Sequence, residues 1–182
     1  VKVALSMFCD DMSAVTGRQA VHTNNAVLMI VELDKASEKL RKKLARKNVP
    51  VDEVMSSYDG FNISVYDGNV FIVGKNGRGT AYGILEMSRM AGVSPWIWWG
   101  DVVPEKKSCL TINRNTSVTQ GASVEYRGIF INDEDWSIRP WSEKGQKGLI
   151  GRDTYKKVFQ LLMRLRANAV WPAMHEGTVS FF

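Results

Sequence analysis

The sequence predicts an α/β fold in two consecutive parts. In the first part, helical patterns alternate with apolar runs typical of strands, and one pair of runs has the two-residue period of a β-hairpin. In the second part, a strongly amphipathic helix lies between two short apolar strands, which is the pattern of a βαβ unit. A segment rich in Asn, Thr, Ser and Gly separates them. We therefore predict an N-terminal mixed-sheet α/β domain at 1–112, a linker at 113–123 and a second domain at 124–182.

The chain begins with a helical pattern that ends before Gly17, a residue suited to close a helix. A continuous apolar run at 26–33 follows, which predicts a strand that is buried on both faces. A basic helix comes next, and we expect Asp34 to be its N-cap.

From Phe61 onward, apolar and polar residues alternate, and the residues 67–69 (Asp-Gly-Asn) predict the tight turn of a β-hairpin. A helix over 80–90 follows, closed by Gly92, and 110–112 is a further candidate strand. In the second part, strands are predicted at 126–131 and 168–171. The helix between them spans 152–167.

The composition is that of an ordinary globular protein, with 45% hydrophobic and 24% charged residues. No apolar run approaches the roughly 20 residues of a membrane-spanning helix, so we expect no membrane partner. The two cysteines, Cys9 and Cys109, are far apart and form no cluster. Their spacing predicts neither a disulfide scaffold nor a structural zinc site.

The net charge of +5 raises the question of a nucleic-acid partner. Seven of the 24 cations fall within 35–47, where leucines recur at helical spacing. This stretch lacks the interleaved aromatic residues that would stack on bases. It therefore predicts a helix with a solvated basic face, and no nucleic acid is expected as a partner.

The glycine-rich stretch at 74–79 opens a helix after a strand, which is the context of a phosphate loop. It contains neither GxGxxG nor GxxxxGK[ST], and after Gly79 the next glycine is Gly83. We therefore interpret it as a strand-to-helix turn that requires small residues, and we expect no nucleotide cofactor.

Three consecutive carboxylates follow the strand at 126–131, and such neighbours need partners, protons or a ligand. Strand alternation places Asp133 and Asp135 on one side, and Asn132 and Glu134 on the other. Catalytic and structural interpretations of this run are equally open. A metal site is not predicted, because no histidine is near and the oxygens lack the spacing of a calcium loop.

Corresponding residues follow the strand at 168–171. His175 comes shortly after that strand, and Trp171 lies on it. A lone histidine is more often structural than catalytic, but its place past a strand end favours a role in a site. Trp136, Trp141 and Trp171 all lie near these strand ends, and an indole suits the C–H face of a sugar ring. Core packing is the alternative for each of them.

Four motifs, in this order, resemble glycoside hydrolase family 115, the xylan α-1,2-glucuronidases. They are GRGTAYGILEMS at 77–88, GVSPWIWWGDV at 92–102, YRGIFINDEDW at 126–136 and ANAVWPAMH at 167–175. The chain departs from the family pattern at Gly100, where alanine is expected. It also departs after His175, where Glu176 and Gly177 replace an expected Pro-Cys.

The resemblance implies a glycoside hydrolase that removes (4-O-methyl)glucuronic acid from xylan with inversion and without a cofactor. It also implies that a (β/α)8 TIM barrel begins in the second domain. A barrel needs about 250 residues, and 57 follow Glu125, so we expect an incomplete barrel and an inactive fragment. The expected partner is glucuronoxylan or an acidic xylo-oligosaccharide, and the expected location is the periplasm or the outside of the cell. A homodimer is a candidate assembly for the full-length enzyme.

The resemblance also assigns site residues. Glu134 is the predicted catalytic or sugar-binding carboxylate, while Asn132 and Asp135 are expected to orient sugar hydroxyls. The side chains expected to line the pocket are those of Trp136, Trp171 and His175. The partner carboxylate that inversion requires would come from later strands. The alternative function is that of a non-catalytic carbohydrate-binding module.

Overall fold

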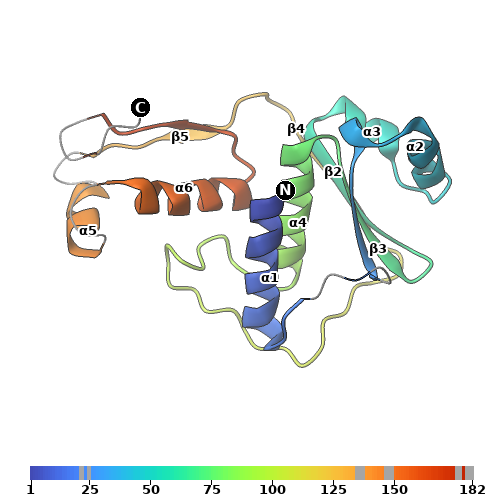
Figure 1. The fold of residues 1–182 in the computed structure, drawn as a ribbon, viewed down its shortest axis with the longest axis horizontal. Helices are drawn as coiled ribbons and strands as arrows, with labels where there is room; N and C mark the ends of the chain where they lie inside the picture. Colours follow the sequence, from blue (N-terminus) through green and yellow to red (C-terminus); the bar gives the residue numbers. More distant parts are fainter. Residues whose placement is uncertain (21–22, 24–25, 134–137, 146–149, 175–177, 179–182) are drawn as a thin grey trace. The chain divides into compact units, whose positions relative to one another are not determined.

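Figure 1 shows the computed structural model of the chain, which describes residues 1–182 except 21–22, 24–25, 134–137, 146–149, 175–177 and 179–182. The chain divides into two compact units, Val1–Glu125 and Tyr126–Phe182. Each unit combines helices with a sheet of its own. The α/β fold class predicted from the sequence is confirmed.

The first unit is built on a four-stranded mixed sheet with the order β1-β3-β2-β4. β1 (Leu28–Glu32) runs parallel to β3 (Asn69–Gly74), whereas β2 (Tyr58–Tyr66) is antiparallel to both β3 and β4 (Ser117–Ala122). β1 is an edge strand, and all five of its residues are only partly buried. The prediction of a strand buried on both faces is therefore wrong for this segment.

The predicted β-hairpin is confirmed as β2 and β3. Asp67 and Gly68 both have positive φ, 50° and 72°, which is the backbone geometry of a tight two-residue hairpin turn. This turn fixes the register that pairs Ile63 with Ile72. Both isoleucines are fully buried, so the hairpin forms the middle of the core.

One face of this sheet is covered by α4 (Gly77–Met90), and α1 (Lys2–Thr16) packs along α4, as Figure 1 shows. α1 ends at Gly17 as predicted, with φ of 71° and its N–H bonded to the carbonyl of Ser13. On α4, a Cβ at Gly83 would lie 2.7 Å from the Cγ2 of Ile72. The absence of a side chain at Gly83 therefore lets the helix approach the sheet closely.

The other face is covered by α2 (Glu38–Ala45) and α3 (Val51–Ser56), which bury Leu44 and Val54 against Phe71. A short 3₁₀ turn (Leu33–Lys35) precedes α2, and Ser37 caps the helix by accepting a hydrogen bond from the N–H of Leu40. The prediction of Asp34 as the N-cap is wrong, because the chain completes this extra turn before the helix begins. α3 was not predicted from the sequence.

The segment predicted to be a linker, 113–123, contains β4. This strand is held to β2 by its ladder and by Asn62, whose Nδ2 donates to Thr119 Oγ1 over 3.1 Å. A Cβ at Gly121 would lie 2.2 Å from Ser57 Cβ, so close packing explains that glycine. The polar residues belong to an edge strand rather than to a linker. By contrast, the candidate strand at 110–112 has no regular structure.

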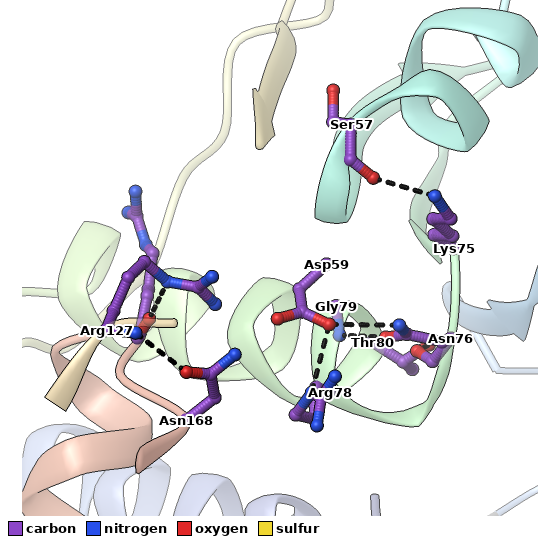
Figure 2. A network of polar contacts seen from close by, with 10 residues as sticks. Ser57, Asp59, Lys75, Asn76, Arg78, Gly79, Thr80, Arg127 and Asn168 are labelled. Carbon is purple, nitrogen blue, oxygen red and sulfur yellow. Dashed lines mark hydrogen bonds and ion pairs between the residues drawn. The ribbon is translucent and has the colours of Figure 1, made fainter. Parts of the chain in front are cut away.

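In the second unit, β5 (Gly128–Phe130) and β6 (Ala169–Trp171) pair in parallel, and α6 (Arg152–Arg164) lies between them in sequence. This is the predicted βαβ unit. Figure 2 shows the amino ends of the two strands joined: the N–H of Arg127 donates to Oδ1 of Asn168 over 2.9 Å. No closed barrel is present in the described part of this unit.

Another helix of the second unit, α5 (Ile138–Gly145), was not predicted from the sequence. Tyr155, Val158 and Leu162 form the buried face of α6, whereas Phe159 and Leu165 on the same helix pattern remain 39% and 45% exposed. Among the helices that the structure describes, none is both long and apolar enough to cross a membrane.

Candidate active site

The candidate site begins where the parallel strands β5 and β6 end. Phe130 pairs with Trp171 at the last position of both strands, and the N–H of Ile131 donates to the carbonyl of Trp171 over 2.9 Å. The segments that leave the two strands therefore start side by side. Carboxyl ends of parallel strands are where α/β enzymes place their reacting groups.

Asp133 is the described carboxylate of the acidic run, and it is buried, with 1% of its surface exposed. Its Oδ2 accepts a hydrogen bond from the hydroxyl of Thr178 over 2.5 Å. Thr178 also forms an isolated parallel bridge with Ile150. Asp133 thus ties the segment after β5 to the segment after β6.

Tyr155 brings α6 into the same network. Its hydroxyl accepts a hydrogen bond from the N–H of Ala173 over 2.8 Å, just past the end of β6. Burial raises the pKa of Tyr155, the bond from Ala173 partly opposes this, and the negative charge of Asp133 raises the pKa further. Tyr155 therefore keeps its proton well into the alkaline range, so the hydroxyl can also act as a donor.

The predicted site residues fall into two groups. Asn132 is half-buried directly after β5, and Trp171 is 65% exposed at the end of β6, so both lie at the predicted edge of the sheet. The other four lie outside the described residues: Glu134, Asp135, Trp136 and His175. The roles assigned to all six stay predictions.

Asp133, Tyr155 and Thr178 were not predicted as site residues. The alternation had already placed Asp133 on the side opposite Asn132 and Glu134, and this was a signal for an inward-facing carboxylate. A tyrosine on the apolar face of α6 carries a hydroxyl that needs a partner once it is buried. Thr178 gives no comparable signal in the sequence.

The glycine-rich turn before α4 was the other candidate for a site, and Figure 2 shows the polar contacts that its side chains make within the chain. Asn76 caps α4 by accepting from the N–H of Gly79 over 2.8 Å. Asp59 Oδ1 in turn accepts from Asn76 Nδ2 at 2.9 Å and from Arg78 Nε at 3.0 Å, a bond that raises the pKa of Arg78. A Cβ at Gly74 would lie 2.2 Å from the backbone N of Thr80. These contacts agree with the strand-to-helix turn.

We expect stability of the second unit to fall at alkaline pH because of Tyr155. The pKa of this tyrosine is raised in the folded state, so its contribution is complete below the ordinary value of about 10. Above that pH the unfolded chain ionises while the folded one does not, and stability is lost. Tyr155→Phe should flatten this alkaline loss in urea titrations followed by tyrosine and tryptophan fluorescence. An equally steep loss of stability in Tyr155→Phe would show that Tyr155 is not its cause. Tyr66→Phe, on the hairpin of the first unit, serves as the control.

Matches were found both among protein families and among solved structures. A family model for glycosyl hydrolase family 115 matches residues 119–182, which include β5, α6 and β6. A solved family GH115 4-O-methyl-α-glucuronidase, BtGH115A, described as specific for decorated arabinogalactans, is 39% identical with a TM-score of 0.83. The match covers 98% of this chain and 24% of that one.

A search among curated proteins gives no match. The solved relative spans nearly the whole of the present chain, including the first unit and the strand ends described above. The family model independently covers the second unit. The chain belongs to glycoside hydrolase family 115.

Proposed function

We propose that this chain is the N-terminal part of a glycoside hydrolase that releases (4-O-methyl)glucuronic acid side chains from xylan. The observation that carries the proposal is the buried Asp133 with its partner Thr178, placed where two parallel strands end together in a family 115 chain. The chain corresponds to 24% of its solved relative, which supports a longer enzyme. Large polysaccharides do not cross membranes unaided, so we place its action in the periplasm or outside the cell.

The proposed mechanism is single displacement with inversion. A carboxylic acid protonates the leaving oxygen, and a carboxylate about 6.5–9.5 Å away activates water on the opposite face of the sugar. We assign one of these roles to Glu134. Asn132 and Asp135 would orient sugar hydroxyls, and Trp136, Trp171 and His175 would line the pocket. Trp171 is suited to this role because its indole is largely exposed at the strand end.

Asp133 has a different role in this proposal. A carboxylate that is 1% exposed and bonded to Thr178 cannot readily reach a sugar, but it can hold the neighbouring acidic residues in place. Tyr155 contributes to the same support through the N–H of Ala173. We therefore treat Asp133 and Tyr155 as positioning residues behind the reacting groups.

The proposal is tested by product analysis with the full-length enzyme. Glucuronoxylan, a uronate-decorated arabinogalactan and neutral xylan are supplied separately, and the released sugar is followed by NMR. We expect (4-O-methyl)glucuronic acid from glucuronoxylan, appearing first as the β-anomer because inversion converts the α-linkage. Faster release from the arabinogalactan would show that arabinogalactan, and not xylan, is the preferred substrate. No release from either acidic polymer, or the α-anomer first, would overturn the proposal.

A further inference from the structure

The net positive charge of the chain comes entirely from one short segment of the first unit. Residues 35–47 hold seven of the 24 Lys and Arg residues and one acidic residue, Glu38. The remainder of the chain, with 17 cations and 18 anions, is nearly neutral. The overall charge of +5 is therefore a property of α2 and its two ends rather than of the whole surface.

Part of this charge is already engaged within the chain. Four cations have partners: Lys35 with Glu32 at 3.1 Å, Arg41 with the carbonyl of Leu33, Lys42 with Glu38 at 2.6 Å, and Lys47 with the ring of Tyr66 at 4.3 Å. The other three, Lys39, Lys43 and Arg46, are exposed and have no partner among the residues that the structure describes.

The three unengaged cations form one stripe. Their spacing of four and then three residues places them on the same face of α2, over a length of about 10 Å. A shallow hollow of about 560 Å³ lies along this face, lined by Lys39, Lys42, Lys43 and Arg46 together with Glu38. The stripe is opposite Leu44, which is buried with α3 in the core. We call this face, formed by Lys39, Lys43 and Arg46, the α2 cationic stripe.

The surroundings limit what this stripe can bind. Insertion of α2 into a membrane would require its apolar side, and Leu44 on that side is only 2% exposed. Single-stranded nucleic acid would require aromatic rings for stacking, and none lines the hollow. The charged groups of Lys and Arg, on flexible side chains, can instead bind a hydrated polymer that carries carboxylates at intervals along its length.

We propose that the α2 cationic stripe binds acidic polysaccharide through its uronate carboxylates. The proposal rests on the proposed function, which supplies a polymer of that charge as substrate. A weak second contact on the same polymer raises the local concentration of its side chains near the enzyme and prolongs each encounter. The stripe thereby acts on substrate capture and not on the chemical step.

The experiment measures the binding of this 182-residue chain to polysaccharide by affinity electrophoresis in native gels. The test variant is Lys39→Gln/Lys43→Gln/Arg46→Gln. The matched control, Lys2→Gln/Lys106→Gln/Arg114→Gln, removes the same three charges at other exposed positions. All six side chains are exposed, so both variants should unfold at the urea concentration of the wild type, which is measured first.

We expect glucuronoxylan to retard the wild type and the control, and the test variant to bind about tenfold or more weakly. Retardation should weaken with added salt and be lost when the uronates of the polymer are reduced to neutral sugars. Equal loss in the two triple variants, or no retardation of the wild type, would overturn the proposal. Stronger retardation by duplex DNA at equal charge concentration would also overturn it.

This result is separable from that of the proposed function. Product analysis measures uronate release by the full-length enzyme, whereas the gel measures binding by a surface on the first unit. If the full-length enzyme releases uronate but this chain does not bind glucuronoxylan, the proposed function is supported and the proposed binding by the stripe is refuted. If this chain binds glucuronoxylan but the full-length enzyme releases no uronate, binding by the stripe is supported and the proposed function is refuted.

Discussion

Replacing Glu134 by glutamine in the full-length enzyme is expected to lower uronate release by about 10²–10⁴-fold, the usual contribution of a general acid or base. The substitution keeps the shape of the side chain and removes its charge and its proton. Initial rates on acidic xylo-oligosaccharides measure the effect. Glu105→Gln, the same change at an exposed position of the first unit, is the control and should retain the wild-type rate.

A second substrate separates the roles open to Glu134. An aryl uronide with a good leaving group needs little protonation, so the variant should act on it at a near-normal rate if Glu134 is the acid. If Glu134 is the base, both substrates should be slow. If it only binds sugar, KM should rise while kcat is largely kept. Near-normal release from xylo-oligosaccharides by a folded variant would refute the assignment altogether.

Amide hydrogen exchange on the 182-residue chain is expected to divide it into two regions of very different protection. In β2 and β3, Phe61, Ile63 and Ile72 are at most 1% exposed. In the second unit, by contrast, Phe130 and Trp171 on the paired strands are 60% and 65% exposed. We expect amides of β5 and β6 to exchange at least about 100-fold faster than those of β2 and β3, because little apolar surface supports them.

The same measurement on the full-length enzyme is the control. There, further strands should cover β5 and β6 and raise their protection toward that of the first unit. Strong and equal protection of both regions in the short chain would contradict this expectation. It would mean that the βαβ unit is stable without additional strands.

The elements that local sequence specifies were predicted well. Asp67 and Gly68 specify the hairpin turn, and Gly17 specifies the end of α1, because positive φ at these positions restricts the choice of residue. The N-cap of α2 was predicted wrongly, since Asp34 and Ser37 are both good caps and only the intervening 3₁₀ turn selects Ser37. β4 was also missed because local sequence does not specify it. It has no apolar pattern of its own, and its pairing with β2 makes it a strand.

The sequence pointed to one edge of the second sheet as the candidate site, and that assignment stays a prediction. The acidic run follows the apolar strand β5 at the edge where β5 and β6 end together. The burial of Asp133 depends on Thr178, 45 residues away in the chain, and no local pattern encodes such a contact. In the same way, the apolar periodicity of α6 marked Tyr155 as buried but could not name Ala173 as the partner of its hydroxyl.

The position of β4 in the chain also affects how the protein folds as it is synthesised. β3 ends at Gly74, and β4 ends 48 residues later, at Ala122. The edge of β2 therefore stays unpaired while the ribosome adds the intervening segment. At ordinary elongation rates of about 5–20 residues per second, this interval lasts roughly 2–10 s. During that time a nascent chain presents an open strand edge and three newly made tryptophans, Trp96, Trp98 and Trp99. The first unit is therefore most exposed to chaperones and to misassembly just before its last strand leaves the ribosome.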